Sequence, residues 1–572
     1  MLSRADAVTA LAAERFDVVV IGGGITGAGT ALDAASRGYS VALLERDDFA
    51  SGTSSRSSKL VHGGLRYLQN FDLGLVREAL LERQLLVKLA PQIVHPLKLV
   101  VPAFDGVRPD RITGLGLGMY DVMSAARRRG RRFGRRDRAA EIADELAGME
   151  DWSPERHRVI SGDEVVRLMP ALAPREPTGG YLFYDCQTDD ARLVLTVLAE
   201  AERFGAVCAG RIEVTELVED AAGQVAGVRA RDRESGEPLC VQADNVINAT
   251  GVWADRIRPE ELHSEAEVPR IAPSRGTHIT LAHDALPLVS GAIVPAGSGR
   301  TIFALPWLGR SLIGTTDVNF DGDVDRVHPS ADDIDYLLDA VNAFFLTSLE
   351  PGDVTGAFAG VRPLISTGDS RKSVDISRKA ELYETSSGMI TITGGKLTTF
   401  RRMAKMAVDA LVERDGRYAP CRTGEIPLGQ PVVADRLTRV QGVADDAYAA
   451  LAGRYGHDAE RVLQIAAADP ALAVPIAPGL PDLLAEAVYA ARHEQARSLV
   501  DVMMRRTRLG LLAGRVLARA DEQSAAPVQA VAAVVGDELG WDATRRAAEV
   551  DAFRLEATVV DPATPAPDAS VD

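Results

Sequence analysis

The chain has 572 residues, which is too long for a single small binding module and predicts roughly three or four domains. With 46% hydrophobic and 25% charged residues it can bury large cores, which excludes a chain that is disordered or collagenous throughout. Its 64 basic and 81 acidic residues give a formal net charge of −17, which argues against a general nucleic-acid binder.

Cysteine usage and the N-terminus indicate the compartment. The four cysteines stand far apart, with no C-x-x-C pair and no histidine at ligand spacing, so we expect neither a disulfide framework nor a bound metal. Asp6 and Glu14 precede the first apolar run, which argues against a signal peptide. No apolar run approaches the roughly 18 residues that span a bilayer. These features predict a cytoplasmic protein that does not cross a membrane.

Residues 16–48 predict a βαβ unit. Residues 18–21 form a continuous β-branched run, typical of a strand buried on both faces of a parallel sheet. A glycine cluster then begins a helix that ends near Gly38, and residues 40–45 form the next strand. The very short connections complete the unit.

The glycines of this unit spell G-x-G-x-x-G between strand and helix, at Gly22, Gly24 and Gly27, and Glu45 ends the second strand. The first glycine allows a tight turn, the second admits a pyrophosphate to the backbone, and the third lets helix and strand pack closely. The helix N-terminus supplies free N–H groups, and the acid binds ribose hydroxyls. The complete unit predicts a dinucleotide site and outweighs the alternative of an ordinary glycine turn.

The next stretch, SGTSSRSSKLVHGGLRY at 51–67, indicates which dinucleotide is bound. A nicotinamide enzyme usually continues with further βα repeats, whereas small hydroxyl residues and glycines suit a loop wrapped around a larger cofactor. A solvated Ser-rich linker is the alternative, but its lysine, histidine, arginine and tyrosine are unusual for a linker. A helical pattern follows over 65–90 and ends at Pro91.

An arginine-rich run lies in the middle of this acidic chain: eight of the twelve residues at 127–138 are arginine. The neighbouring residues 114–123 are glycine-rich and apolar. Three interpretations are open, namely a solvated loop, an RNA contact and a peripheral contact with an anionic membrane. We favour the membrane contact, because a basic segment beside an apolar one can bind an anionic surface.

The rest of the chain first mixes helix and strand patterns and then has helix patterns alone. Its patterns predict helices at 191–204 and 332–345 and strands around 212–217, 225–230, 245–249, 278–317 and 389–393. Beyond about residue 425 the strand patterns stop, and helical spacing such as that of 483–504 predicts a separate all-helical domain. The Pro-, Ala- and Asp-rich end predicts a disordered tail.

Several long motifs resemble those of one known family. They are VVIGGGITGAG, TSSRSSKLVHGGLRYL, YDCQTDDARLV (184–194), NATGVWAD (248–255), IGTTD (313–317), GVRPL (360–364) and GGKLTTFR (394–401), in family order over about 16–405. On these motifs the chain is identified as a member of the aerobic FAD-dependent glycerol-3-phosphate dehydrogenases. It departs from the family in about its first 15 residues, from the arginine-rich run to about residue 174, and in its acidic tail.

The resemblance implies the fold class: an α/β protein with a FAD/NAD-binding doubly wound domain, an inserted mixed α+β substrate domain and an all-helical C-terminal domain. The expected boundaries are an N-terminal extension at 1–15, FAD-binding parts at 16–95, 181–258 and 359–410, substrate parts at 96–180 (with the arginine-rich segment) and 259–358, the helical domain at 425–555 and the tail at 556–572.

FAD is the cofactor that the resemblance implies. NATG places a small-residue turn after a strand, where the backbone can lie against the pyrophosphate. In GGKLTT, two glycines precede a helix whose N-terminal amides can face the N1 and O2 edge of the flavin and stabilise the reduced ring. The alternatives are a plain strand-end turn and a plain glycine N-cap. The predicted cofactor-binding residues are Gly22, Gly24, Ile25, Thr26, Gly27, Glu45, Arg46, Thr53, Ser54, Ser57, Ser58, Lys59, Leu60, Ala249, Thr250, Gly251, Gly395, Lys396, Leu397 and Thr398.

The substrate site needs cations for a phosphate and a base for a hydroxyl proton. Arginine forks bind phosphate oxygens in pairs, lysine adds a point charge and a tyrosine hydroxyl can donate. Histidine has a resting pKa suited to accepting the proton, and we favour His278 over His62, the alternative for each being a structural core histidine. The predicted substrate-binding residues are Arg66, Tyr67, His278, Arg362, Arg378 and Lys396, and the predicted catalytic residues are His278, Arg362, Lys396 and His62.

The resemblance implies oxidation of sn-glycerol 3-phosphate to dihydroxyacetone phosphate, with electrons passed to a membrane quinone. It also implies peripheral attachment to the inner face of the cell membrane. We allow for a homodimer and expect no nucleic-acid partner. The nearest alternative is a glycerol-3-phosphate oxidase that uses oxygen, and the more distant ones are a D-amino acid or sarcosine oxidase-like flavoenzyme and a FAD-containing RNA-binding protein.

Overall fold

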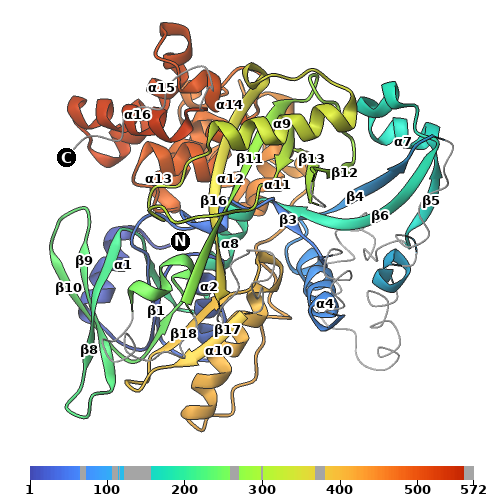
Figure 1. The fold of residues 1–572 in the computed structure, drawn as a ribbon. Coiled ribbons are helices and arrows are strands. Elements are labelled where there is room, and N and C mark those ends of the chain that lie inside the picture. The colour runs from blue at the N-terminus through green and yellow to red at the C-terminus, as the bar shows by residue number, and fades with distance from the viewer. Residues whose placement is uncertain are drawn as a thin grey trace.

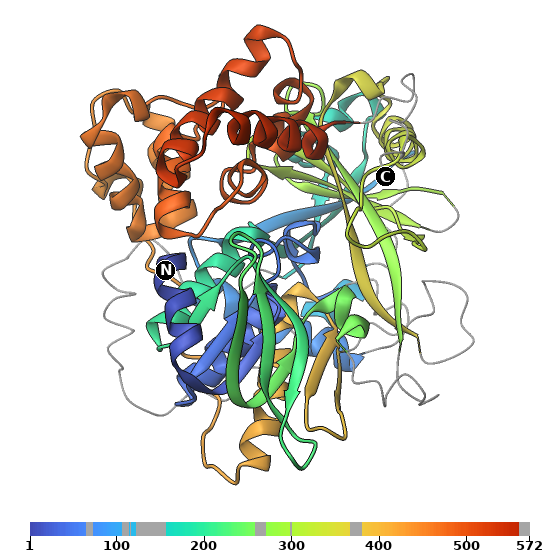
Figure 2. The same cartoon turned by 90° about the vertical axis from the view of Figure 1, so that its left-hand side faces the viewer.

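Two β-sheets and a group of C-terminal helices make up the protein in the computed structural model (Figure 1). The structure describes residues 1–64, 73–105, 114, 116–121, 156–257, 270–297, 300–366 and 380–559. Each sheet is assembled from segments far apart in the chain. The C-terminal helices lie above the first sheet and beside the second in both views (Figures 1 and 2).

The first sheet contains the predicted βαβ unit and is mostly parallel. In spatial order it consists of β17 (Ala380–Glu384), β18 (Ile390–Gly394), β10 (Pro238–Asn248), β1 (Arg15–Ile21), β2 (Val41–Leu44) and β7 (Val207–Ala209). Strand β9 (Val225–Asp232) pairs with β10, and β8 (Ile212–Glu219) pairs with β9. The β-branched run of β1 is buried because helices cover one of its faces and the β8–β9 hairpin the other.

Helices α2 (Ile25–Ser36), α8 (Asp190–Arg203) and α10 (Phe400–Arg414) share a core with one face of this sheet. On the opposite face lies α1 (Arg4–Ala13), which buries Ala7 and Leu11. The predicted N-terminal extension is therefore a helix that belongs to the first sheet's core.

The second sheet is the larger one and carries the strand-like pieces predicted at 278–317. In spatial order it consists of β15 (Val318–Asn319), β11 (Arg270–Ala282), β14 (Arg310–Gly314), β13 (Thr301–Trp307), β12 (Gly291–Pro295), β4 (Val94–Ala103), β6 (Gly179–Thr188) and β3 (Leu60–Val61). Strand β16 (Val354–Ser366) pairs with β11 along nearly its whole length, and β5 (Arg158–Ser161) pairs with β6. Helix α9 (Ala331–Phe345) covers one face with Ile334, Leu337 and Val341.

Three predicted domain boundaries fall inside strands of this second sheet. The boundary at 95/96 lies in β4, that at 180/181 in β6 and that at 358/359 in β16. Strand β3, from the predicted first FAD-binding part, also pairs with β6. Buried strands have the same apolar character in both sheets, so the sequence pattern does not indicate which sheet a strand joins. The second sheet therefore takes residues from all three predicted FAD-binding parts.

The C-terminal part of the chain is helical, as predicted. Its helices are α11 (Asp445–Tyr455), α12 (Ala459–Ala468), α13 (Leu484–His493), α14 (Leu509–Leu517), α15 (Glu522–Leu539) and α16 (Ala543–Ala557). The segment 483–504, which has helical spacing, forms α13 up to His493, and a separate helical turn follows at Asp501–Arg506. The Asp501 carboxylate accepts the N–H groups of Arg497 and Ser498 and so ties the preceding loop to the start of this turn. Helix α16 ends inside the predicted tail, whose residues 560–572 lie outside the described part.

Buried ion pairs join these helices to the first sheet's domain. Asp48 pairs with Arg505 and Arg506, and Arg192 pairs with Glu494, all with side chains at most 7% exposed. Removing one partner of such a pair leaves an uncompensated buried charge, which costs about 3 to 5 kcal/mol. The pairs therefore hold the two parts in one relative position.

The described residues contain no helix that is both long and apolar enough to cross a membrane. The predicted helix at 65–90 is described as α4 (Leu73–Leu89). The arginine-rich run at 127–138 lies outside the described residues.

Candidate active site

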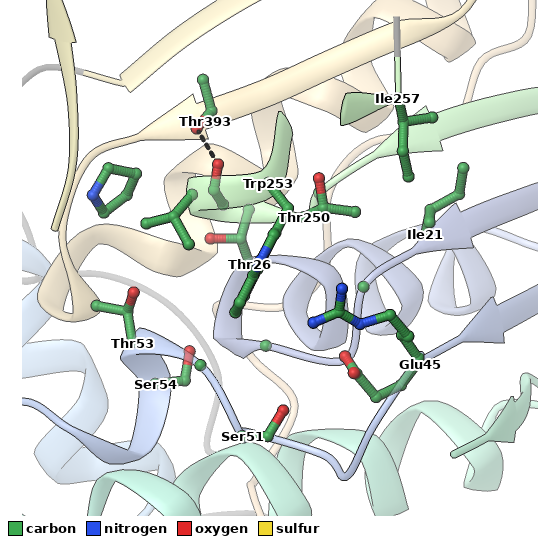
Figure 3. A pocket seen from close by; sticks show the side chains of 18 of the residues that line it. Ile21, Thr26, Glu45, Ser51, Thr53, Ser54, Thr250, Trp253, Ile257 and Thr393 are labelled. Carbon is green, nitrogen blue, oxygen red and sulfur yellow. Dashed lines mark hydrogen bonds between the residues drawn. The ribbon is translucent and has the colours of Figure 1, made fainter. Parts of the chain in front are cut away.

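A cavity of about 400 Å³ opens where β1, β2, β10 and β18 of the first sheet end (Figure 3). Ligands of doubly wound folds bind at the carboxyl ends of the parallel strands, because the glycine turns and helix N-termini gather there. The cavity brings together most of the residues predicted to bind the cofactor. Those that line it are Gly22, Gly24, Ile25, Thr26, Glu45, Arg46, Thr53, Ser54, Ser57, Ala249, Thr250, Gly251, Gly395, Lys396 and Leu397.

The two glycine turns of the cavity press against each other. Gly22 has a φ of +107°, and a Cβ there would lie 2.8 Å from the carbonyl oxygen of Ala249. Next to it, α2 begins at Ile25, whose N–H donates to Ser54 Oγ at 2.9 Å. A helix N-terminus presents backbone N–H groups and a partial positive charge, which suits a pyrophosphate.

Glu45 stands at one side of the cavity and Thr393 at the other, with Thr26 between them (Figure 3). The Glu45 carboxylate accepts the N–H groups of Gly23 and Asp47, both at 2.7 Å, which fixes its orientation. Burial raises the pKa of Glu45 to about 7. A carboxylate has about four acceptor positions, so this one can still accept a ribose hydroxyl.

Part of the cavity wall was not predicted. Trp253 lines it, and its indole N–H donates to Asp325 at 2.6 Å. Asp325 also accepts from Arg46 at 2.7 Å and Arg256 at 2.6 Å. Burial alone would raise the pKa of Asp325, but these arginines lower it to about 2. Trp253 belongs to the NATGVWAD motif, and an aromatic residue beside a cofactor turn was a signal that could have identified it.

Strand β8 was also missed as a wall of the cavity, which its residues 212–217 line. Its alternating pattern predicts a strand but carries no chemical signal.

Five predicted cofactor residues lie beside the cavity instead of in its wall. Lys59 is buried against Asp190, with its Nζ 2.8 Å from both carboxylate oxygens, because burial requires its charge to be paired. The Ser58 hydroxyl contacts His278, and the Thr398 hydroxyl donates to the carbonyl of His62. Leu60 lies in β3. Gly27 packs so closely that a Cβ would lie 1.8 Å from the carbonyl oxygen of Gly22.

The predicted catalytic histidines share a face of the second sheet. Phe303, Gly314, His278 and Phe358 stand directly opposite one another on β13, β14, β11 and β16, and directly opposed residues point to the same face. The His278 ring stacks on Phe358 at a centroid distance of 4.9 Å and an angle of 9°. The His62 ring meets Phe303 edge-on at 6.5 Å. The two histidines therefore lie on the same face, His278 beside Gly314 and His62 beside Phe303.

Both histidines are neutral at pH 7. Burial lowers the pKa of His62 to about 4, and the positive charge of Lys396 contributes in the same direction. Burial also lowers the pKa of His278 well below 6.5, with further contributions from Lys59 and Arg362. A neutral imidazole has one nitrogen free to accept a proton.

Arg362 reaches the same face from β16. Its guanidinium lies over Gly276, where a Cβ would be 2.5 Å from Nη2, and Gly276 is two residues from His278 on the same side of β11. It donates to Thr315 Oγ1 at 3.0 Å and to the carbonyl of Thr316 at 3.1 Å. The IGTTD turn thus orients the guanidinium, a role that sequence reasoning did not assign to it.

The YDCQTDD motif holds this region in place. The Asp185 carboxylate accepts the Tyr120 hydroxyl at 2.6 Å and the N–H of Gly63 at 3.2 Å, which fixes the chain beside His62. Asp189 caps α8 and pairs with Arg508 of the C-terminal part. The other predicted substrate residues, Arg66, Tyr67 and Arg378, lie outside the described residues.

Comparison with known proteins agrees with this geometry. The profile of the family described as FAD dependent oxidoreductase matches residues 17–410, and that of the C-terminal domain of alpha-glycerophosphate oxidase matches 421–546. Fold and cavity therefore define a FAD-dependent oxidoreductase.

The relatives narrow this class. Glycerol-3-phosphate dehydrogenase 2 of Mycobacterium tuberculosis is 37% identical, over 98% of this chain and 92% of its own. The aerobic glycerol-3-phosphate dehydrogenase of Staphylococcus haemolyticus is 34% identical, over 86% and 87% respectively. The structure of the glycerol-3-phosphate dehydrogenase from Bacillus halodurans complexed with FAD matches with a TM-score of 0.75 and 28% identity, over 99% of both chains. The chain belongs to the FAD-dependent glycerol-3-phosphate dehydrogenase family.

FAD is the cofactor, and the residues present fit it. The cavity has a carboxylate for a ribose at one side, a helix N-terminus for the pyrophosphate in the middle, and the Gly394–Gly395 turn at the other side. At Gly22 a Cβ would already meet the facing turn, so the closeness of the backbone there depends on glycine.

Proposed function

We propose that the protein oxidises sn-glycerol 3-phosphate to dihydroxyacetone phosphate and passes the electrons to a membrane quinone. The observation that carries the proposal is that Arg362, His278 and His62 lie on one face of the second sheet, while Lys396 lines the cofactor cavity and acts electrostatically on His62. A phosphorylated alcohol needs both cations and a neutral base, whereas an amino acid carboxylate needs fewer cations.

Each group has a role that follows from its chemistry. Arg362 presents a planar fork held by the IGTTD turn, and Lys396 adds a point charge, so both are suited to a phosphate. We assign Arg66 and Tyr67 to the same phosphate on the resemblance of their motif, and Arg378 as a further cation for it. His278 accepts the hydroxyl proton, with His62 as the alternative acceptor. When bound, FAD supplies the acceptor for the hydrogen that leaves C2 with its electron pair.

An anaerobic absorption spectrum tests the substrate. We expect the flavin absorbance to bleach after glycerol 3-phosphate is added and to remain after glycerol, D-alanine or sarcosine is added. Bleaching by an amino acid but not by glycerol 3-phosphate would replace this proposal with the amino acid oxidase alternative.

The electron acceptor needs its own assay. The C-terminal domain resembles that of an oxidase by its family description, so oxygen is a specific competing acceptor. We expect steady-state turnover with a soluble quinone analogue to exceed turnover with oxygen by at least about tenfold. A faster reaction with oxygen would identify the protein as an oxidase.

Delivery to a membrane quinone requires a membrane contact, which we assign to the arginines at 127–138. Of the neighbouring apolar stretch at 114–123, Leu117 and Tyr120 are buried in the protein and take no part in this contact. Each cation near an anionic surface contributes about 1 kcal/mol of attraction. The attraction of half of these arginines could outweigh the repulsion between the membrane and the acidic rest of the protein, because salt screens that repulsion beyond about 8 Å. Replacing the arginines with Gln should release the protein from anionic liposomes at low salt and leave turnover with a soluble acceptor intact. Equal sedimentation of both forms would identify the segment as a solvated loop.

A further inference from the structure

The ring of His278 is enclosed on both of its faces. It is 2% exposed and lies parallel to Phe358 on one side. On the other side is Gly314, where a Cβ would come within 2.2 Å of the ring carbon Cδ2. The ring can therefore make polar contacts only in its own plane, through its two nitrogens.

These two nitrogens have different surroundings. Nε2 lies 2.8 Å from the hydroxyl oxygen of Ser58. Nδ1 is buried, and no residue in the described part of the chain makes a hydrogen bond to it. In a neutral imidazole one nitrogen carries the proton and the other accepts, so the partner of Nε2 decides what Nδ1 can do.

Ser58 is held firmly from both sides. Its neighbour Ser57 donates both its N–H, at 3.1 Å, and its hydroxyl, at 2.6 Å, to Asp190. Its other neighbour, Lys59, is in the left-handed region with a φ of +59° and donates to Asp190 and to the carbonyl of Ser55. Asp190 is 1% exposed. A buried ion pair thus fixes the position of the Ser58 hydroxyl.

The charges that face His278 come from two elements. Lys59 precedes β3 and lies over the Phe358 ring at 4.9 Å, with Asp190 as its partner. Arg362 reaches over Gly276 from β16 and pairs with Asp317 at 3.3 Å. Two facing cations disfavour a positively charged ring, so His278 is neutral at pH 7 and the location of its single proton matters.

We propose that Ser58 is a positioning residue that accepts the Nε2 proton of His278 in a hydrogen bond, so that Nδ1 is the atom that takes the hydroxyl proton of the substrate. This inference rests on the proposed function. The alcohol O–H bond breaks and its proton goes to Nδ1. The C2–H bond breaks and its electron pair leaves with the hydrogen to the bound flavin, while the C=O bond forms.

A spectroscopic test needs no substrate. In the holoenzyme labelled with ¹⁵N-histidine, the His278 resonances are assigned by their loss in His278→Gln. We expect a protonated Nε2 and an unprotonated Nδ1 in the wild type, and a mixture of both tautomers in Ser58→Ala. A proton on Nδ1 in the wild type would overturn the proposal.

A kinetic test uses two matched variants. Ser311→Ala removes another buried hydroxyl, which donates to the carbonyl of Leu286 at 2.6 Å and lies outside the site, and Ser58→Thr keeps the hydroxyl. At unchanged FAD content, Ser58→Ala should lower kcat/KM about tenfold, the loss that one hydrogen bond can cause. Ser311→Ala should not lower it, and Ser58→Thr should restore it.

The pH profile decides the direction of the hydrogen bond. A donor on Nε2 bonds Oγ more strongly when the ring is charged, so losing Ser58 should move the acid limb of kcat/KM to lower pH. A shift to higher pH, or a response equal to that of Ser311→Ala, would overturn the proposal. Absence of any flavin reduction in the wild type would instead refute the proposed function, and the tautomer would still be read from the resonances.

Discussion

The cofactor cavity and the substrate face of the second sheet are built in different ways. The cavity is formed largely by backbone: the Gly22 turn, the start of α2 and the Gly251 and Gly394–Gly395 turns. The substrate face is formed by side chains that project from four neighbouring strands, with Gly314 and Gly276 leaving room for their neighbours. The cavity should therefore be sensitive to any added Cβ, and the substrate face to the chemistry of single side chains.

One segment joins the two regions. Residues 51–62 line the cavity with Ser54 and Ser57 and then reach the substrate face with Ser58 and His62. Because the Lys59 ion pair lies in the middle of this segment, it supports both regions at once.

The largest effect should come from a side chain added to the cavity. A Cβ at Gly24 would meet only Ser54 Oγ, at 3.2 Å, so Gly24→Val leaves the fold possible but places a branched side chain where the pyrophosphate approaches. We expect the variant to purify colourless, with FAD content reduced at least about tenfold. Gly352→Val is the control, since a Cβ there meets nothing within 4 Å. A yellow Gly24→Val protein with normal FAD content would show that this turn does not hold the dinucleotide.

Breaking the shared ion pair should disturb both regions. Lys59→Met leaves Asp190 charged and buried without its partner, so we expect a loss of about 3 to 5 kcal/mol in the free energy of unfolding. Denaturant unfolding measures this loss of stability, and FAD retention measures the disturbance of the cavity. The control is Lys405→Met, which removes an exposed pair with Asp409 worth at most about 1 kcal/mol. Equal losses in the two variants would contradict a structural role for the buried pair.

The same difference between the regions explains what the sequence could predict. The βαβ unit, the glycine turns and Glu45 are consecutive in the chain, and their spacing alone predicts a dinucleotide site. His278, Arg362 and the IGTTD turn meet only through strand pairing across the second sheet, which no local spacing encodes. Arg362 and the IGTTD turn were identified through resemblance to a family and His278 through the chemistry of its side chain, and their mutual contacts were not predicted.

The sheet to which a strand belongs could not be read from the sequence for a related reason. Strands β4, β6 and β16 have buried runs like those of the first sheet, so their place in the second sheet depends on pairing partners distant in sequence. Asp185 and Asp190 belong to the motif YDCQTDDARLV, but the sequence does not show which residues they bind through hydrogen bonds.

A smaller effect should follow from changing the shape of one cation on the substrate face. Arg362→Lys keeps the charge but loses the fork that contacts Thr315 and Thr316 and that, in the proposed function, binds a pair of phosphate oxygens. Charge-assisted hydrogen bonds contribute roughly 1.5 to 3 kcal/mol, so kcat/KM should fall about 10- to 100-fold while FAD stays bound. Arg229→Lys, at an exposed pair with Glu216, is the control. Unchanged efficiency in Arg362→Lys would remove this residue from the site.

The smallest effect concerns how the buried histidines respond to pH. The pKa of His62 in the folded protein is about 4, below its ordinary value of 6.5, because burial disfavours the charged ring. Between these values the unfolded chain binds a proton that the folded protein does not. The stability contributed by neutral His62 is therefore complete above about pH 6.5 and is lost as the pH falls toward 4, by up to about 1.4 kcal/mol per pH unit. His62→Gln should flatten this dependence in denaturant midpoints measured at pH 5 and pH 7.5, although the lowered pKa of His278 leaves a residual slope. The control is His457→Gln, at an exposed position, which should leave the pH dependence of stability unchanged. If the wild type and both variants showed the same pH dependence, His62 would take up its proton as freely in the folded protein as in the unfolded chain.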